Sequence, residues 1–205
     1  MDKTKTKENE RNGTLQRCLD NCQIRAVEGN ERRFKLSFSS EEPYDRWWGT
    51  EILSHDEAAV DLTRLNSIGC VLYNHNRDKV IGRILSASIE NGRGEAEIEF
   101  DKDTESEIVY QKVASGTLKG VSVGYVVDVW EDVAANKKSK DGRFTGPCSI
   151  ATKWTPFEVS IVSVPADPTV GVGRSHGEKE QGVSGFYFNE KQLQINANLL
   201  KEVKK

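Results

Sequence analysis

Apolar and polar residues alternate along much of the middle of the chain, and this pattern predicts β-strands. Residues 34–38 alternate in this way, whereas residues 70–73 form a short apolar run between a glycine and an asparagine. Residues 80–89 and 95–100 flank Asn91-Gly92, a pair typical of tight turns, so we expect them to form one hairpin. In the second segment three apolar residues alternate with three glutamates, which predicts one buried face and one acidic, solvent-exposed face.

Two longer strands are expected in the second half of the chain, over 118–130 and 148–164. The segment between them, 131–147, is charged and contains glycine, so we expect a mobile excursion. Alternation predicts that several apolar side chains share one face of each strand. These are Val121, Val123, Tyr125, Val127 and Val129 in the first strand, and Phe157, Val159 and Ile161 in the second.

Helical spacing is limited to a few segments. It is present over 104–115, where Thr104 and Glu107 form a capping box and Gly116 is a typical C-terminal stop. A shorter helix is expected near 57–66. Because strands dominate, the sequence predicts an α+β fold with a β-rich, barrel-like antiparallel core and a few surrounding helices, not a doubly wound sheet.

Composition changes the picture by dividing the chain. Only 36% of all residues are apolar, but the deficit lies at the two ends. Residues 36–174 carry 15 basic and 22 acidic side chains, or 15 − 22 = −7, whereas the stretches before and after them are weakly basic. We therefore expect a flexible polar N-terminal arm over 1–21, a folded domain over 22–174, and a polar tail over 175–205 that contains a short amphipathic helix.

Charge and motif content argue against several classes of protein. No apolar run approaches the roughly 18 residues of a membrane span, and the polar start MDKTKTKENERNG does not predict a secretory signal. A net charge of −3 argues against nucleic-acid binding. Cys18 and Cys22 have no second ligand pair nearby, so no metal site is expected. The four cysteines fit reduced thiols better than a disulfide framework.

Among the three histidines, His75 is the candidate general base. It directly follows the short strand 70–73, and a strand end fixes the backbone while the next loop admits a substrate. Its imidazole can accept a proton near neutral pH. The competing interpretation is a histidine in a surface loop without a chemical role.

Ser122 and Glu158 are the other two candidates. Ser122 lies in a strand between Gly120 and Gly124, and glycine in a strand often marks the close approach of a ligand or another backbone. A serine nucleophile needs such access and an adjacent base. Glu158 is a lone carboxylate in an apolar strand and could orient an imidazole. The competing interpretations are an ordinary polar-face serine and a solvent-exposed carboxylate.

Taken in order, four segments resemble the prohead maturation proteases of tailed bacteriophages, a family related in fold to the herpesvirus assemblin proteases. The resemblance runs from about residue 22 to residue 174. The segments are Arg46-Trp47-Trp48-Gly49 through Glu51-Ile52-Leu53, then Val71 to Asn76 followed by Ile81-Gly82-Arg83, then Gly116 to Tyr125, and finally Trp154 to Pro168.

The resemblance implies a serine endopeptidase with Ser122 as nucleophile, His75 as base and Glu158 as the orienting acid. It implies no cofactor. The implied substrates are the major capsid protein or its scaffolding segment, a scaffold protein, and the protease itself. The implied location is the assembling procapsid in the host cytoplasm, and a homo-oligomer is compatible with it.

Two other functions remain open at this stage. One is a non-catalytic capsid scaffolding domain of the same fold, which guides assembly by binding. The other is a β-rich binding domain unrelated to phage. The distance between His75 and Ser122 separates the enzyme from the unrelated domain, because a nucleophile and its base must lie within hydrogen-bond reach.

Overall fold

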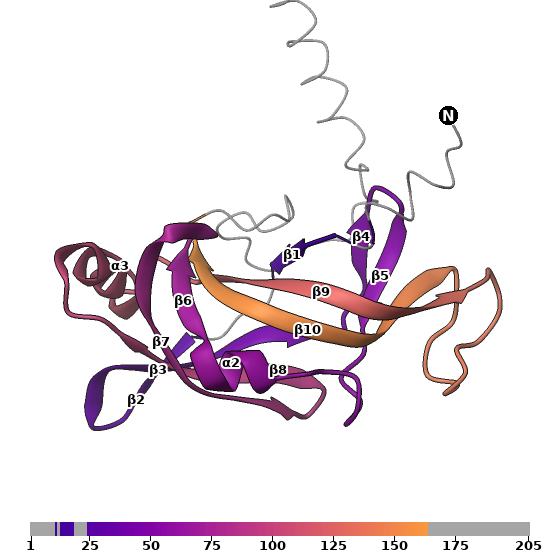
Figure 1. The fold of residues 1–205 in the computed structure, drawn as a ribbon, viewed down its shortest axis with the longest axis horizontal. Helices are drawn as coiled ribbons and strands as arrows, with labels where there is room; N and C mark the ends of the chain where they lie inside the picture. Colours follow the sequence, from indigo (N-terminus) through magenta and orange to yellow (C-terminus); the bar gives the residue numbers. More distant parts are fainter. Residues whose placement is uncertain (1–10, 12, 19–23, 164–205) are drawn as a thin grey trace, which may run out of the picture. The chain divides into compact units, whose positions relative to one another are not determined.

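The computed structural model describes residues 11, 13–18 and 24–163, all within the first of two compact units, Met1–Asp167. The expected polar tail and its amphipathic helix lie outside the described residues. The elements, labelled in Figure 1, are β1 (Leu15–Cys18), β2 (Ile24–Val27), β3 (Asn30–Ser40), β4 (Tyr44–Arg46), β5 (Gly49–Leu53), α2 (Thr63–Ile68), β6 (Cys70–Tyr73), β7 (Asn76–Glu90), β8 (Arg93–Phe100), α3 (Thr104–Ala114), β9 (Gly120–Val133) and β10 (Cys148–Val162).

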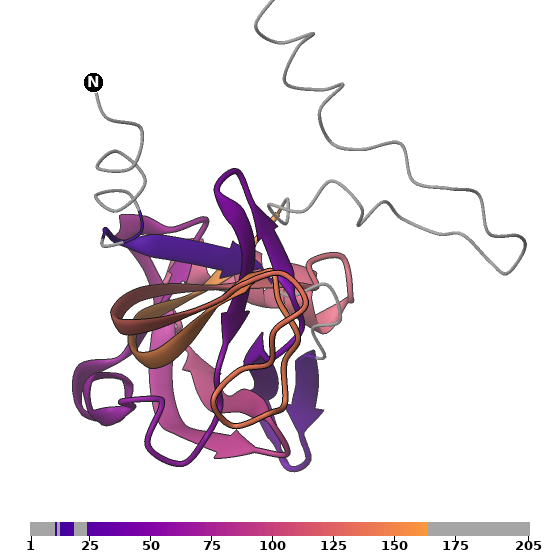
Figure 2. The same cartoon turned by 90° about the vertical axis from the view of Figure 1, so that its right-hand side faces the viewer.

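The described strands form one curled sheet, which confirms the expected β-rich α+β fold (Figure 2). The strand order is β1-β9-β10-β6-β7-β8-β3-β2, with β5 attached to β10 and β4 to β5. Most pairs are antiparallel, as expected, but β10 pairs in parallel with both β5 and β6. The second of these pairings places the end of β6 beside the part of β10 that follows Glu158, and this is where the candidate residues lie.

The β7–β8 hairpin matches its prediction. Asn91 and Gly92 both have positive φ, 52° and 71°, as a two-residue turn of this kind requires. On β8 the residues Ala96, Ile98 and Phe100 are buried, and the glutamates between them face the other side. The alternation of the sequence therefore sets the face of this strand that packs into the core.

The two described helices pack against β7, as Figure 1 shows. Helix α3 lies where the sequence predicts it, but the capping box is wrong. Asp103 is the N-cap, and its carboxylate accepts the backbone N–H groups of Glu105 and Ser106 at 3.0 and 3.1 Å. An aspartate accepts these N–H groups at least as well as a threonine and also interacts favourably with the helix dipole. The shorter helix, α2, begins later than expected.

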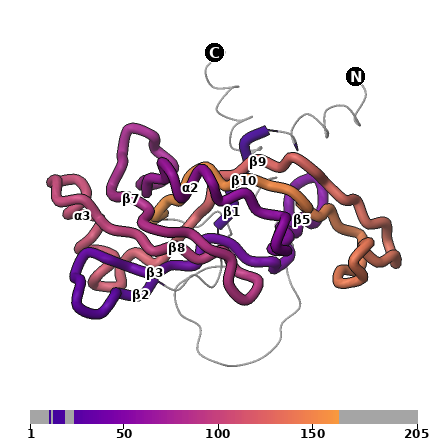
Figure 3. The backbone as a smooth tube through the Cα atoms, turned by 60° about the horizontal axis from the view of Figure 1, so that its bottom comes forward, coloured from indigo at the N-terminus to yellow at the C-terminus, as the bar shows by residue number. Residues whose placement is uncertain are grey.

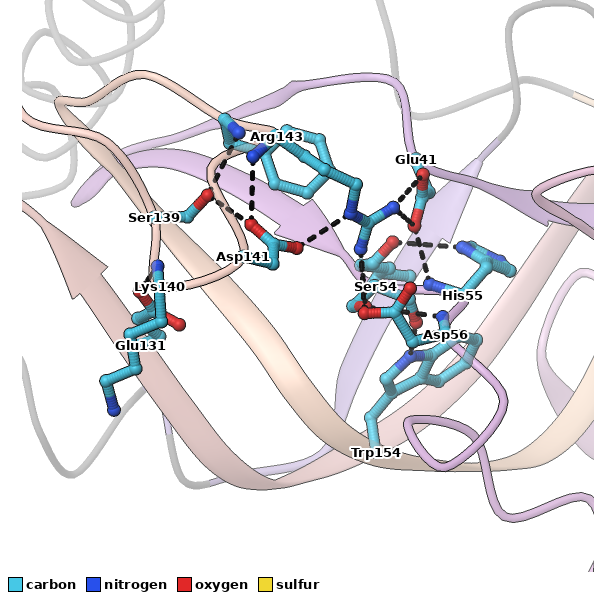
Figure 4. A network of polar contacts seen from close by, with 12 residues as sticks. Glu41, Ser54, His55, Asp56, Glu131, Ser139, Lys140, Asp141, Arg143 and Trp154 are labelled. Carbon is cyan, nitrogen blue, oxygen red and sulfur yellow. Dashed lines mark hydrogen bonds and ion pairs between the residues drawn. The ribbon is translucent and has the colours of Figure 1, made fainter.

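The charged segment 131–147 is not the free excursion that its composition suggests. Its first three residues continue β9, and β9 and β10 run side by side into the loop that joins them (Figure 3). Arg143 anchors that loop, because its guanidinium pairs with the carboxylates of Glu41, Asp56 and Asp141 at 2.7–2.9 Å (Figure 4). Composition cannot reveal these partners, since two of the three lie far away in the sequence.

Two side chains depart from the expected strand faces. Val129 is exposed, although the other members of its stripe are in the core. On β10 the register with β9 shifts between Pro156 and Glu158, so Phe157 is bulged out of the alternation and lies outside the main core, whereas Val159 and Ile161 are fully buried. No helix in the described part of the chain is long and apolar enough to cross a membrane.

Candidate active site

His75 lies in the two-residue turn between β6 and β7. Asn74 and His75 both have positive φ, 51° and 57°, an uncommon conformation that asparagine and histidine tolerate better than most residues. The turn is anchored to the end of β10: the Asn74 N–H donates to the Ile161 carbonyl at 2.9 Å, and Asn74 Oδ1 accepts the N–H of Ser163 at 2.9 Å. One anchor is in β10 and the other directly follows it, so the end of that strand fixes the position of the imidazole.

Ser122 and Glu158 are brought together by the pairing of β9 with β10. In that antiparallel register Ser122 lies opposite Ser160, and Glu158 lies opposite Gly124. The bulge at Phe157 precedes Glu158 directly. A bulge re-aims the side chains that follow it, and here the Glu158 carboxylate points toward the histidine turn.

The three candidate residues form one chain of hydrogen bonds. His75 Nε2 lies 2.8 Å from Ser122 Oγ, and His75 Nδ1 lies 2.5 Å from Glu158 Oε1. Ser122 is 1% exposed and Glu158 is 5% exposed, so the hydroxyl and the carboxylate are both buried. Glu158 is therefore not the solvent-exposed carboxylate of the competing interpretation.

The two glycines beside Ser122 serve protein packing. A Cβ at Gly124 would lie 2.6 Å from both Cγ and Oε1 of Glu158, and one at Gly120 would lie 2.7 Å from the Val162 carbonyl. Of the two expected neighbours, a ligand or another backbone, Gly120 has the backbone of the adjacent strand, whereas Gly124 has the Glu158 side chain. Gly124 makes room for the carboxylate at the distance that its hydrogen bond to His75 needs.

An unexpected contact comes from the N-terminal strand. Residues Leu15–Cys18 fall in the arm that was expected to be flexible, yet they form β1 and pair with β9 so that Cys18 lies opposite Ser122. Ser122 Oγ also lies 2.9 Å from the Arg17 carbonyl oxygen, so its single hydroxyl proton can be donated either to that oxygen or to His75 Nε2. Four residues give too short a pattern to predict a strand, and their partner lies about a hundred positions away.

His55 has a structural environment in a second polar network (Figure 4). Its ring nitrogens lie 2.7 Å from Ser39 Oγ and 2.9 Å from the Leu53 carbonyl, and its ring packs edge-on against Trp154. Burial lowers the pKa of His55 to about 4, so the imidazole is neutral at physiological pH. The third histidine, His176, lies outside the described residues.

No group of three or more metal-binding side chains is found among the residues that the structure describes. Cys18 is a buried free thiol, and Cys22, its partner in the C-x3-C spacing, lies outside them. Burial raises the pKa of the Cys70 and Cys148 thiols above the ordinary value, which disfavours a reactive thiolate at either position.

A hydroxyl bonded to an imidazole that is itself bonded to a carboxylate can support acyl transfer. The imidazole can take the hydroxyl proton as the oxygen attacks a carbonyl, and the carboxylate can fix the tautomer of the ring. This arrangement on a strand-rich domain is that of the serine hydrolases as a class.

The comparison with known families agrees with that class. The model of the family described as caudovirus prohead serine protease matches residues 54–181, and the chain belongs to this family. The matched range includes His75, Ser122 and Glu158 but not the Arg46-Trp47-Trp48-Gly49 segment. The interpretation as a β-rich domain unrelated to phage is therefore wrong.

Similarity to one phage protein extends over most of the chain. The chain is 36% identical over 144 residues to a protein named major capsid protein from Halomonas phage phiHAP-1. That alignment covers 68% of this chain but only 23% of the relative, so the chain spans about a quarter of the relative's length. No solved structure matches the chain.

Proposed function

We propose that this protein is a serine endopeptidase that matures the phage prohead, with Ser122 as nucleophile, His75 as general base and Glu158 as the acid that orients His75. The observation that carries the proposal is the continuous hydrogen-bonded chain from Ser122 Oγ through both nitrogens of His75 to Glu158. Membership of the prohead serine protease family supports the same conclusion.

The mechanism follows from the positions of these atoms. His75 Nε2 takes the proton of Ser122 as Oγ attacks the carbonyl carbon of the bond to be cleaved, and then gives it to the departing amine. Glu158, through Nδ1, keeps the Nε2 lone pair directed at the serine and stabilises the imidazolium that forms. Water then hydrolyses the acyl-enzyme by the same proton transfers in reverse order.

The proposed substrates are capsid-assembly proteins: the major capsid protein or its scaffolding segment, a scaffold protein, and the protease itself. The similarity to a protein named major capsid protein supports an association with the shell. On this proposal the enzyme works inside the assembling procapsid, in the host cytoplasm, without a cofactor.

Co-expression of the chain with the capsid protein of its phage tests the proposal. We expect the wild-type chain to process the capsid protein and the Ser122→Ala variant to leave it uncleaved, as followed by mass spectrometry. Ser86→Ala is the matched control, because Ser86 is an exposed serine on β7. Processing by Ser122→Ala at the wild-type rate would show that the nucleophile is wrongly assigned.

A non-catalytic scaffolding domain is the second candidate, and the name of the phage relative favours it. In this case the domain would bind capsid proteins without cleaving them. The two candidates differ in one reaction. A fluorophosphonate probe that modifies Ser122 in the assembled particle would eliminate the scaffolding interpretation, because such probes react with activated serines only.

A further inference from the structure

Strand β1 is the last strand of the sheet beside β9, the strand that carries Ser122. In the strand order β1-β9-β10, β9 would be the edge of the sheet if β1 were removed. An extended peptide recognises such an edge by adding to it as another strand. β1 does this with its own backbone, and the register sets Arg17 opposite Val123 and Cys18 opposite Ser122. The carbonyl group next to Ser122 is that of Arg17, because its oxygen lies 2.9 Å from Ser122 Oγ.

The side chain of Arg17 is enclosed in a pocket of the same domain. Arg17 is 2% exposed, its guanidinium donates to the Glu42 carbonyl, and it lies 5.2 Å from the centre of the Tyr44 ring. Its Nη1 atom lies 3.9 Å from Oε1 of Glu51, a carboxylate with no exposed surface. A planar cation is thus held between an aromatic face and a buried negative charge, the surroundings that suit a guanidinium.

Residues other than Arg17 hold the pocket in shape. The Tyr125 hydroxyl donates to Glu51, and Arg46 donates to Glu51 at 3.3 Å and to the Tyr125 oxygen at 2.7 Å. Arg46 also donates to the carbonyl of Gln16 at 2.8 Å, a contact with the strand backbone that does not depend on the Gln16 side chain. The pocket therefore binds a backbone and a cationic side chain separately, as a subsite for a peptide does.

The hydrogen bonding of the Arg17 side chain in this pocket is incomplete. In the described part of the chain its Nε and Nη1 atoms have no hydrogen-bond partner, although both are buried. Burial also lowers the pKa of Arg17, despite the raising effect of Glu51. A buried charge with unpaired N–H groups contributes poorly to stability. An arginine at this position is therefore explained less well by a contribution to the stability of the fold than by two other features. These are its charge complementarity with Glu51 and the hydrogen bond of its carbonyl oxygen to Ser122 Oγ.

Resting on the function proposed above, we propose that the Glu51 pocket selects an arginine on the acyl side of the cleaved bond, and that the Arg17–Cys18 peptide bond is itself a substrate. Glu51 is then a specificity-determining residue. Arg46 is a positioning residue that holds Glu51 and the strand backbone.

The reaction on this bond balances with water as the co-reactant. Ser122 Oγ bonds to the Arg17 carbonyl carbon while His75 takes the hydroxyl proton. The bond from that carbon to the Cys18 nitrogen breaks, and His75 gives its proton to the nitrogen, which becomes the new amino terminus. Water then attacks the ester, releases the segment that ends at Arg17 as a carboxylate, and returns the proton to Ser122.

The test uses the full chain, co-expressed with the capsid protein and analysed by intact mass spectrometry and N-terminal sequencing. We expect a product that begins at Cys18, and we expect it to be absent from Ser122→Ala. Arg17→Ala should reduce cleavage at this bond by at least about tenfold, and Arg17→Lys should retain part of it, because only the second keeps the charge. The matched control is Arg25→Ala, since Arg25 is an exposed arginine on β2.

Glu51→Gln keeps the size of the pocket but removes its charge. We expect it to slow cleavage after Arg17 by at least about tenfold while the circular dichroism spectrum is unchanged. If Glu51→Gln fails to fold, the Arg17 variants decide alone, because β1 is a short edge strand whose side chain at this position can be truncated without opening the β9–β10 pair.

The outcomes separate this inference from the proposed function. An N-terminus that stays intact, or is cut at another bond, in a preparation that processes the capsid protein in a Ser122-dependent way would overturn the pocket assignment and leave the function standing. Cleavage after Arg17 that is unchanged in Arg17→Ala would also overturn it. If neither protein is processed, the enzyme assignment and the pocket assignment both fail.

Discussion

The Glu158→Gln substitution gives the sharpest test of how the three candidate residues act together. It keeps the size and nearly the shape of the side chain but removes its charge, 2.5 Å from His75 Nδ1. The amide can also donate an N–H to Nδ1, which holds the ring in the tautomer whose Nε2 carries the proton. Such an imidazole cannot accept the proton of Ser122. We therefore expect a folded protein with a much slower reaction.

The magnitude follows from burial and distance. Glu158 is 5% exposed, so little water screens it from His75. With an effective dielectric constant of about 20 and an effective charge separation of roughly 4 Å, the attraction between carboxylate and imidazolium is about 4 kcal/mol. At about 1.4 kcal/mol for each factor of ten, this corresponds to roughly 10³ in rate. The wrong tautomer raises the loss toward about 10⁴-fold, the cost of the equivalent change in a serine protease triad.

A time course of capsid-protein processing, with purified protease in excess, measures this loss as the change in the single-turnover rate. Glu95→Gln is the matched control, because Glu95 lies on the solvent-facing side of β8 and the chemical change is the same. Circular dichroism confirms that both variants are folded. A Glu158→Gln rate within about tenfold of the wild-type rate would refute the orienting role of Glu158, because the reasoning requires a loss of at least about 10³-fold.

Two further predictions concern packing and pH. Gly124→Ala places a Cβ 2.6 Å from Oε1 of Glu158, so we expect the displaced carboxylate to lower the processing rate by about 10²-fold. In the double variant with the shorter Glu158→Asp, part of the lost rate should return. If the double variant instead loses the product of the two single rate losses, this explanation is contradicted. Because burial lowers the pKa of His55 from 6.5 to about 4, its stabilising effect is complete above pH 6.5 and disappears as the pH falls toward 4. Urea unfolding should show a loss of about 3 kcal/mol over this range that is absent in His55→Gln, and equal acid sensitivity of the two proteins would contradict the assignment.

The strands with a clear alternation could be predicted from the sequence. The β7–β8 hairpin is the best example, because the turn residues Asn91-Gly92 and the period of two in 95–100 specify the same structure independently. The helix over 104–115 could be predicted from its spacing and its C-terminal glycine, although its N-cap is Asp103 rather than the predicted Thr104. The ion pairs of Arg143 with Glu41 and Asp56 could not be predicted, because composition gives the charge of a loop but not the residues with which that charge pairs.

For the candidate site, the sequence supplied the residue types and the strands that carry them. His75 after a short strand, Ser122 between glycines and Glu158 in an apolar strand were all visible, but none of the three is distinctive alone. Only the order of the segments and the resemblance to the family indicate that these three residues act together. The neighbour of Gly124 could not be predicted, because a glycine in a strand shows that something approaches closely but not that it is the Glu158 side chain.

What the sequence determined by itself is local: the period of each strand, the turn between β7 and β8, and the helical segment. The tertiary structure alone decided which distant strands pair. The parallel contact of β6 with β10 and the antiparallel contact of β9 with β10 bring His75, Ser122 and Glu158 within hydrogen-bond distance. The contact between the Arg17 carbonyl oxygen and Ser122 Oγ likewise depends on the pairing of two distant strands, β1 and β9. The physical reason is that strand pairing uses backbone groups, which are the same at almost every position, so the partner depends on packing across the whole domain.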